Sequence, residues 1–371
     1  MIGTMKLNYN INELNYKATF CNNKESPDIF KALSKLYCDK KMLLIIDKKL
    51  NKKFTKYLFK DLKKCGLNVT LLKVEGSKYN KNEKLLFKII DKLIEKKFSK
   101  KSVLLSCGGG VIGDVSALAA SLYLRGMIYY HIPTTMTAIV DSCLGGKTGI
   151  NYKNIINSVG NYYHSQNIFI SKNVIELIPV REFLSGVPEI IKCGIIDNKK
   201  ILSILRKDKK KLINRDYDFL SKLIKLTLNT KIKFFKNDVY ENADRLNLNF
   251  GHTFAHAIEM SLKGKKTDLL RHGEAVGIGM LCEIFYTEGK SKIYKMTKDI
   301  LGHYNLPQNL LFLNSKDKNN IKKDIFKNIF LDKKKIGKYP RIIKIEKIGK
   351  SKIFEMKNNN EIKKTIQEVL F

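Results

Sequence analysis

Three of the chain's six histidines lie in the segment NFGHTFAHAIEMSLKGKKTDLLRHGEAVGIGM, residues 249–280. His252 and His256 are four residues apart, so a helix would present both on one face. His272 follows in the sequence RHGEAVGIG. A pair at this spacing can bind one metal ion together, or it can direct one imidazole to a metal and the other to a substrate. Because a single histidine is more often structural, the choice depends on the neighbouring motifs.

A glutamate from a different segment could join the histidines as a third metal ligand. Pro188 in SGVPEIIKCG fits the first turn of a helix, and Glu189 and Lys192 would share one face of it. An exposed ion pair is the usual meaning of this spacing. Two histidines and a distant glutamate, however, form a His2Glu set that leaves coordination positions open for a substrate. This second interpretation predicts a catalytic metal site.

A glycine-rich segment, LLSCGGGVIGDVSALAASLYLRG, is typical of a phosphate-binding turn. Gly108, Gly110 and Gly113 have G-x-G-x-x-G spacing between an expected strand and an expected helix. Glycines let the backbone approach a pyrophosphate, and the helix N-terminus supplies unpaired N–H groups. The motif follows two earlier strand–helix units, whereas the usual dinucleotide fingerprint belongs to the first, and Asp47 ends the first strand instead. The segment therefore predicts either a dinucleotide site of unusual order or a plain turn.

The next polar segment is HIPTTMTAIVDSCLGGKTGIN, residues 131–151. It contains paired threonines after an expected strand, then Asp141, and then Lys147 in a glycine turn. It is not a Walker A loop, because aspartate stands at 141 where that motif requires its first glycine. A lysine on a glycine turn can hold an anion as a point charge, and a surface turn is the alternative.

Short apolar runs alternate with amphipathic segments from residue 42 to about 135, which is typical of a parallel sheet covered by helices. Strands are expected at 42–47, 69–74, 102–106, 127–132 and 167–171. Helices are expected near 52–65, 82–97 and 113–124. Helical periodicity then dominates from about 176 to 310, as in 220–235, and a short strand is expected at 341–348. We therefore predict a Rossmann-like α/β dinucleotide-binding domain over residues 1–175 and a mainly α-helical domain over 176–371.

The net charge of +35 raises the question of nucleic-acid binding, since clustered cations gain affinity by releasing counterions from phosphates. Only seven of the 70 basic residues are arginine, however, and the remaining 63 lysines are spread along the chain. Genome composition explains this excess, because lysine, asparagine and isoleucine share A/T-rich codons. We expect no specific nucleic-acid binding. With no apolar run of about 18 residues and no leader pattern, we expect a cytoplasmic protein that is not bound to a membrane.

Six motifs occur in a defined order along the chain: GGGVIGD, PTT, VDS with GGKT, SG..E..K.G, NFGHTF.HAIE and HGEAVGIGM. In this combination the chain closely resembles the 3-dehydroquinate synthase family from residue 42 to about 336. The resemblance implies an N-terminal NAD-binding domain, a helical metal- and substrate-binding domain, and an active site in the cleft between them. It also implies a homodimer, bound NAD and one divalent metal ion, with zinc expected and cobalt as the alternative.

The resemblance also assigns individual residues. Glu189, His252 and His272 match the metal ligands, His256 faces the substrate phosphate, and Arg125 matches an arginine that a neighbouring subunit contributes. The other polar positions of the substrate pocket are Asp141, Lys147, Asn157, Lys192, Lys231, Glu241, Arg245, Asn249 and either Lys333 or Lys334. The NAD-contacting positions are Asp47, Glu75, Gly76, Ser77, Lys78, Tyr79, Asn80, Gly110, Val111, Ile112, Gly113, Asp114, Thr134, Thr135 and Lys147.

The implied reaction starts with oxidation of 3-deoxy-arabino-heptulosonate 7-phosphate at C5 by NAD. Phosphate then leaves by elimination, NADH returns its hydride, and ring opening with an aldol closure gives 3-dehydroquinate for aromatic amino-acid synthesis through the shikimate pathway. In this family the leaving phosphate serves as the base, so the protein chiefly positions and polarises the substrate. Lys231 and Arg245 would hold the substrate carboxylate.

The chain departs from the family at three cofactor positions. Ile156 and Asn80 stand where lysines are usual, and Leu177 stands where a threonine is common. These departures concern cofactor affinity rather than the chemistry. The alternative functions are another sugar-phosphate cyclase, a metal-dependent oxidoreductase of the glycerol dehydrogenase type and, from a different class, a nucleic-acid-binding protein on an inactive scaffold.

Overall fold

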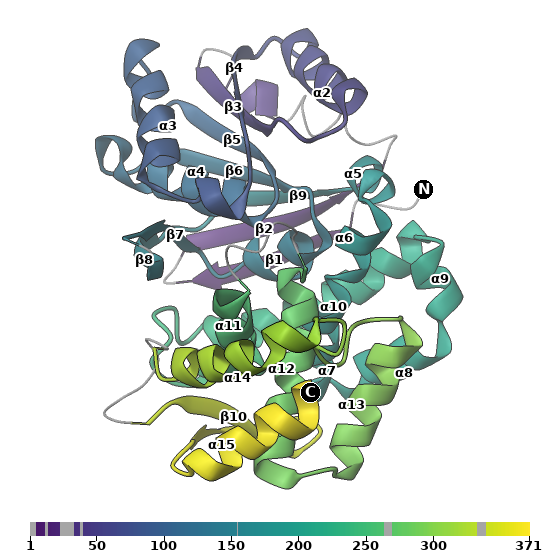
Figure 1. Ribbon diagram of the computed structural model, residues 1–371. Coiled ribbons are helices and arrows are strands. Elements are labelled where there is room, and N and C mark those ends of the chain that lie inside the picture. The colour runs from purple at the N-terminus through teal and green to yellow at the C-terminus, as the bar shows by residue number, and fades with distance from the viewer. Residues whose placement is uncertain are drawn as a thin grey trace. The chain divides into compact units, whose positions relative to one another are not determined.

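The computed structural model describes residues 5–11, 14–22, 33–37, 40–153, 155–262, 269–331 and 339–371. The chain divides into two compact units, Met1–Pro179 and Val180–Phe371 (Figure 1). The sequence analysis placed this division at residue 175. In the described part of the chain, no helix combines the length and the apolar character that crossing a membrane requires.

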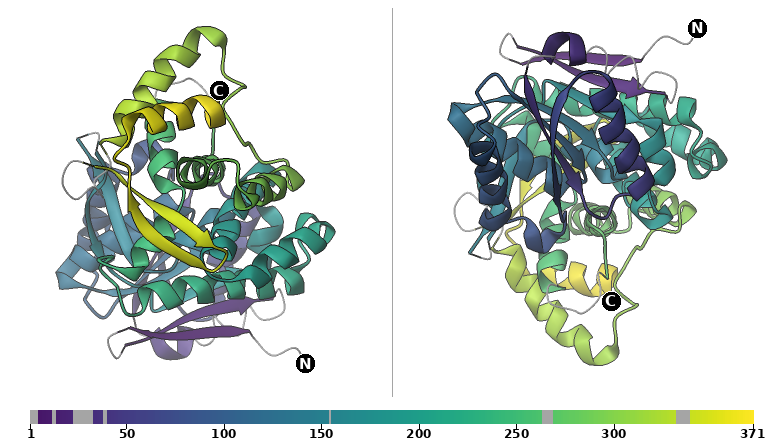
Figure 2. Two further views of the ribbon diagram at one scale, coloured as in Figure 1. Left: turned by 90° about the horizontal axis from the view of Figure 1, so that it is seen from below. Right: turned by 90° about the horizontal axis from the view of Figure 1, so that it is seen from above.

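A seven-stranded sheet forms the centre of the N-terminal unit, in the order β1-β2-β9-β6-β5-β3-β4. Its strands are β1 (Lys6–Ile11), β2 (Leu14–Cys21), β3 (Lys41–Asp47), β4 (Asn68–Val74), β5 (Val103–Gly108), β6 (Ile128–Pro133) and β9 (Asn167–Ser171). The neighbouring strands are parallel except for β1 and β2, which form an antiparallel pair at one edge (Figure 2). The five expected strands are confirmed, whereas β1 and β2 were not predicted.

Helices cover both faces of this sheet. Successive side chains of a strand point to opposite faces, so β3 contributes to two separate cores. Leu43 and Ile45 pack with α3 (Glu83–Glu95) and α4 (Gly110–Leu122). Met42 and Leu44 pack with α2 (Lys52–Lys64) on the other face. This two-sided burial explains why β3 is an uninterrupted apolar run, as is usual in parallel sheets.

A separate hairpin, β7 (Lys147–Tyr152) and β8 (Ile155–Tyr162), follows β6 and forms its own two-stranded sheet. Ile150 of β7 belongs to the core that contains α3 and α4. In contrast, β8 is exposed along most of its length. The sequence analysis did not predict β8, because an exposed strand carries no alternation of apolar and polar residues. The short helix α5 (Lys172–Leu177) ends the unit.

The C-terminal unit is mainly helical (Figure 1). Its helices are α6 (Val180–Leu184), α7 (Val187–Ile196), α8 (Lys199–Lys207), α9 (Lys209–Ile213), α10 (Tyr217–Phe235), α11 (His252–Ser261), α12 (His272–Glu288), α13 (Lys292–His303), α14 (Ser315–Ile329) and α15 (Asn359–Thr365). The strands β10 (Arg341–Lys347) and β11 (Lys350–Glu355) form a hairpin. The central helix is α12, which packs against α7, α11, α13 and β10. Its residues from Gly273 to Phe285 are all buried, as expected for a helix with apolar or small residues on every side.

Candidate active site

Glu189, His252 and His272 come from three helices of the C-terminal unit and meet at one point. Each lies in the first turn of its helix, α7, α11 and α12 respectively. One ligand atom from each residue lies within 4.8 Å of the other two. Glu189 Oε1 is 3.7 Å from His252 Nε2 and 3.9 Å from His272 Nε2. Because the ligand atoms of a tetrahedral zinc ion are about 3.4 Å apart, small movements would close these three around an ion.

Two hydrogen bonds orient the imidazoles of this trio. His252 Nδ1 lies 3.2 Å from the carbonyl oxygen of Phe250, and His272 Nδ1 lies 3.1 Å from Glu259 Oε2. A carbonyl and a carboxylate can only accept, so each Nδ1 donates its proton and each Nε2 keeps its lone pair. Histidines that bind a metal usually donate their other ring N–H to a carbonyl or a carboxylate in this way. The donor set therefore fits a divalent metal ion.

Glu259 was missed by the sequence analysis. It lies on α11, three residues after His256 and seven after His252. Residues at these spacings share one helical face, so the segment HAIE contained the signal for an acidic partner beside the histidines. Its partner, His272, lies 13 residues further along the chain, so the sequence spacing did not indicate that the two are in contact.

Glu189 and Lys192 form a buried ion pair, not the exposed pair that their spacing usually means. Lys192 Nζ is 2.5 Å from Glu189 Oε2, and both side chains are 1% exposed. Within the described ranges, Glu189 Oε1 has no hydrogen-bond partner. Removing charges from water costs several kcal/mol per ion unless partners compensate for the lost hydration. A metal ion beside Oε1 would be such a partner, which is a second observation in favour of a metal site.

Glycines allow the three helices to approach one another closely. A Cβ on Gly273 would lie 1.7 Å from the carbonyl oxygen of Ser185, just before α7. A Cβ on Gly279 would lie 1.9 Å from the carbonyl oxygen of Gly251, which precedes His252 and has a left-handed φ of +83°. Backbone therefore contacts backbone at both places. These contacts bring the beginning of α12 to α7 and its middle to the beginning of α11.

His256 lies beside the trio without belonging to it. Its ring centroid is 5.6 Å from that of His252 and 6.1 Å from that of His272, and the residue is half-buried. An imidazole in this position can contact a substrate bound at the trio. This arrangement matches the interpretation in which the two histidines of the i, i+4 pair have separate roles.

Lys231, on α10, and Arg245, which follows that helix in the chain, are both buried cations. Lys231 is 5% exposed, and Arg245, in η4 (Asp244–Asn249), is 3% exposed. The Arg245 guanidinium lies 5.4 Å from the ring centroid of Phe235, one helical turn after Lys231. Its Nη1 donates to the carbonyl oxygen of Val239 at 2.5 Å. Buried cations of this kind suit the binding of an anionic group.

Polar contacts order the loop that carries Arg245. Asn249 Nδ2 donates to Glu241 Oε1 at 2.7 Å, and Glu241 has a left-handed φ of +61°. Asp238 accepts three backbone N–H groups from residues 242–245. Burial raises the pKa of Asp238, but these three donors and the charge of Arg245 outweigh burial. The pKa of Asp238 is therefore lowered from its ordinary value. Its negative charge therefore persists and fixes the backbone of the loop.

In the N-terminal unit, the expected NAD-contacting segments lie at the carboxyl ends of parallel strands. Asp47 ends β3, residues 75–80 follow β4, Gly110–Asp114 follow β5, and Thr134 and Thr135 follow β6. Asp47 Oδ1 accepts the backbone N–H of Gly76 at 3.3 Å, and a Cβ on Gly76 would lie 2.4 Å from Oδ2. The N-cap of α4, Gly109, has no side-chain hydrogen bond, so the first N–H groups of α4 remain suited to an anion. Open α/β sheets bind their ligands at this edge.

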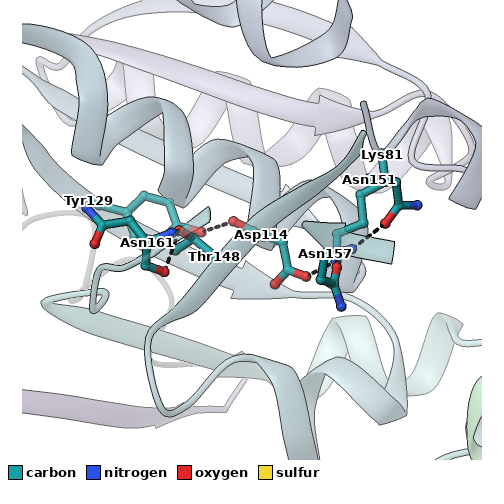
Figure 3. A network of polar contacts seen from close by, with 8 residues as sticks. Lys81, Asp114, Tyr129, Thr148, Asn151, Asn157 and Asn161 are labelled. Atoms are coloured by element: carbon teal, nitrogen blue, oxygen red, sulfur yellow. Dashed lines mark hydrogen bonds and ion pairs between the residues drawn. The ribbon is translucent and has the colours of Figure 1, made fainter. Parts of the chain in front are cut away.

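Lys81 joins two of the expected site residues, and the sequence analysis missed it (Figure 3). Its Nζ lies 2.5 Å from Asp114 Oδ2 and 2.6 Å from Asn157 Oδ1. Burial raises the pKa of Asp114, and Asp141 raises it further; Lys81 and Lys147 lower it, with a net rise. Asp141 and Lys147 thus act on Asp114 through their charges. The structure thus gathers four residues that the resemblance assigned to the site, together with one that it did not.

The remaining expected residues include two exposed side chains, Arg125 and Tyr79. Arg125 is exposed at the end of η2 (Tyr123–Arg125) with a left-handed φ of +61°. In the segment after β4, Tyr79 is 60% exposed and Asn80 Nδ2 donates to the carbonyl oxygen of Glu75 at 3.3 Å. The two alternative lysines of the pocket, Lys333 and Lys334, lie outside the described residues.

Solved structures share this fold over nearly the whole chain. A 2-deoxy-scyllo-inosose synthase complexed with carbaglucose-6-phosphate, NAD+ and Co2+ is similar with a TM-score of 0.82 and 19% identity, covering 99% of this chain and 100% of that one. The 2-epi-5-epi-valiolone synthase of Streptomyces hygroscopicus subsp. jinggangensis 5008, with NAD+ and Zn2+ bound, has a TM-score of 0.81 and 20% identity, covering 97% and 98%. The chain has the dehydroquinate synthase-like fold, which confirms the predicted α/β and helical architecture.

Sequence comparison then defines the family. The family described as 3-dehydroquinate synthase N-terminal matches residues 71–185, and 3-dehydroquinate synthase C-terminal matches residues 186–335. The 3-dehydroquinate synthase of Thermodesulfovibrio yellowstonii is 34% identical over 334 residues, covering 89% of this chain and 90% of that protein. The chain belongs to the 3-dehydroquinate synthase family.

Proposed function

We propose that the chain converts 3-deoxy-D-arabino-heptulosonate 7-phosphate into 3-dehydroquinate and phosphate, as a phosphate-eliminating lyase of the shikimate pathway. Membership of the family supports this substrate and product. The structural observation that carries the proposal is the trio Glu189, His252 and His272, in which both Nε2 atoms face one carboxylate oxygen. Such a set leaves coordination positions for a substrate hydroxyl or ketone.

NAD and one divalent metal ion are the proposed cofactors. The two similar structures contain NAD+, one with Co2+ and one with Zn2+, so we assign zinc first and cobalt as the alternative. Glu189, His252 and His272 would hold the metal, and the carboxyl edge of the sheet around Asp47 and the N-terminus of α4 would hold NAD. When bound, these groups would supply Lewis acidity and a reversible hydride acceptor.

The chain's own residues bind and orient the substrate. Lys231 and Arg245 would pair with its carboxylate, since a buried anion without a cationic partner costs several kcal/mol. His256 would donate an N–H to the substrate phosphate beside the trio. Lys192 neutralises Glu189 across 2.5 Å and keeps the buried carboxylate in place.

Polar residues outside the trio complete the assignment. Glu241 and Asn249 fix each other through their 2.7 Å hydrogen bond and would orient the substrate hydroxyls. In the N-terminal unit, we assign polar contacts with the cofactor and substrate to Asp141, Lys147 and Asn157, which gather around Asp114.

We also propose a cytoplasmic homodimer in which Arg125 contacts the neighbouring subunit. The residues just before this arginine support the assignment, because Leu122 and Leu124 are each 51% exposed. Exposed apolar side chains around an arginine are typical of protein interfaces. Specific nucleic-acid binding is not part of the proposal, since the cations are lysines spread along the chain.

The direct test is turnover by the purified protein with the heptulosonate phosphate, NAD and zinc. We expect stoichiometric phosphate release, 3-dehydroquinate identified by NMR, and no net consumption of NAD. Sedoheptulose 7-phosphate and glucose 6-phosphate lack the carboxylate and are the controls. Turnover of either control in place of the heptulosonate would assign the chain to a sister cyclase, and net accumulation of NADH would indicate a dehydrogenase.

A further inference from the structure

Lys81 connects three segments of the N-terminal unit (Figure 3). Its side chain contacts Asp114 of α4 at 2.5 Å and Asn157 of β8 at 2.6 Å. Its carbonyl oxygen accepts the backbone N–H of Asn151, in β7, at 2.8 Å. Asn151 Oδ1 in turn accepts the backbone N–H of Asn157 at 2.9 Å. One residue just before α3 therefore joins α4 to both strands of the β7–β8 hairpin.

The β8 strand depends on such polar contacts because it has little apolar anchoring. Ile155 and Val159 are 50% and 43% exposed, whereas Ile150 of β7 is in the core. A two-stranded hairpin without an apolar face is marginally stable in water. Asn157 itself has a left-handed φ of +49°, which must be held by its surroundings. Lys81 is positioned to hold it.

Asp114 needs a cation for a separate reason. It lies in the second turn of α4, whose N-terminus would receive the diphosphate of NAD. The side chains of Lys81 and Asp114 are 13% and 19% exposed, so water screens their interaction only in part. Without Lys81, the negative charges of Asp114 and Asp141 would face an anionic ligand, opposed by Lys147, the other lysine that lowers the pKa of Asp114.

We infer that Lys81 is a positioning residue of the cofactor site, which neutralises Asp114 and anchors Asn157 so that α4 and the β7–β8 hairpin present a preformed surface to NAD. The inference rests on the NAD binding proposed above. It gives a specific role to one lysine among the 63 of the chain.

Calorimetric titration of the purified full-length protein with NAD tests this inference. Lys81→Met keeps the aliphatic stem and removes the charge, and we expect its Kd for NAD to rise about tenfold or more, which is about 1.4 kcal/mol of binding free energy. Lys81→Arg should restore the Kd to within about threefold, because a guanidinium can contact both acceptors. Lys84→Met is the matched control: it removes an exposed lysine three residues further along and should leave the Kd unchanged.

A double variant separates charge neutralisation from nonspecific loss of structure. If Lys81 acts on Asp114, Lys81→Met should cost less affinity in an Asp114→Asn background than alone. An unchanged Kd in Lys81→Met, an equal loss in Lys84→Met, no recovery in Lys81→Arg, or strictly additive effects in the double variant would each overturn the inference. A wild-type protein that does not bind NAD would instead reject the proposed function.

Discussion

The candidate metal ligands of the C-terminal unit and the polar cluster of the N-terminal unit are built in different ways. Glu189, His252 and His272 begin helices that touch backbone to backbone at glycines. The cluster around Asp114 instead includes Asn157 on an exposed strand and is joined by one lysine side chain. Close packing leaves a residue few alternative positions, whereas a partly exposed ion pair contributes about 1 kcal/mol or less. Packing therefore determines the position of the candidate metal ligands, and electrostatics determines that of the cluster around Asp114.

The largest effect that this comparison predicts comes from Gly273→Ala. Its Cβ would lie 1.7 Å from a backbone oxygen that cannot move without shifting the start of α7. We expect a loss of about 3 kcal/mol or more in the free energy of unfolding, at or above the upper end for overpacked cores because the clash is with backbone, together with loss of metal binding. The Cβ of Gly277→Ala, on the same helix, would lie 3.1 Å from the end of the Leu301 side chain and 3.5 Å from the Pro188 ring, so this change should cost about 1 kcal/mol or less. Urea unfolding of both variants measures the difference, and equal stabilities would break the packing account.

Arg245→Leu extends the comparison to the substrate side of the C-terminal unit. Removing one partner of a buried ion pair costs about 3–5 kcal/mol, so we expect kcat/KM for the heptulosonate phosphate to fall by roughly 100-fold or more. The exposed Arg206, on α8, provides the control, and Arg206→Leu should leave the kinetics unchanged. Steady-state kinetics that are the same for both variants would show that Arg245 does not bind the substrate carboxylate.

The N-terminal unit contains a buried histidine beneath α4 that should make it acid-sensitive. Burial lowers the pKa of His131 from its ordinary 6.5 to about 4, and Ser106 Oγ lies 2.7 Å from its Nδ1. His131 stays neutral in the folded state while the unfolded chain takes up a proton, so stability falls as the pH drops from 6.5 toward 4. We expect a loss of about 2 kcal/mol between pH 7.5 and pH 5 from this residue. Urea unfolding of wild type and His131→Gln at both pH values measures the contribution of His131. An identical pH dependence of the two proteins would contradict the acid sensitivity assigned to this histidine.

A smaller effect is expected from Glu259→Gln, which changes the outer shell of the metal site but not its packing. The neutral amide is a weaker acceptor for His272 Nδ1, so the affinity for zinc should fall about tenfold. Glu288→Gln, at the far end of α12, serves as the control. Competition with a zinc chelator measures both affinities, and no change in Glu259→Gln would show that packing alone orients His272.

The sequence predicted secondary structure best where burial requires apolar residues to be continuous or regularly spaced. The buried strands from β3 to β6 and the helix α10 were predicted because their apolar residues are continuous or regularly spaced. The start of α4 was placed three residues late, because glycine is a weak helix former and hides the first turn. The β1 strand has a clear alternation of buried and exposed residues in KLNYNI that could have identified it.

Some residues of the site could be predicted from the sequence and others could not. The motifs named the three residues that the structure brings together as candidate metal ligands, and rarity favoured Arg245, one of only seven arginines. Lys81 could not be selected from 63 lysines, because its role depends on contacts with residues 33 and 76 positions away. The expectation that Ile156, Asn80 and Leu177 affect NAD affinity stays a prediction.

The central claim is that Glu189, His252 and His272 hold one divalent ion while His256 serves the substrate. Metal analysis of purified wild type, His252→Ala and His256→Ala after equal exposure to zinc tests it most directly. The account predicts one ion per chain in wild type and in His256→Ala, with the latter slow in phosphate release, and less than about a tenth of that occupancy in His252→Ala. Equal loss of metal from the two alanine variants would mean that the histidines four residues apart bind the ion as a pair, and would contradict the ligand assignment.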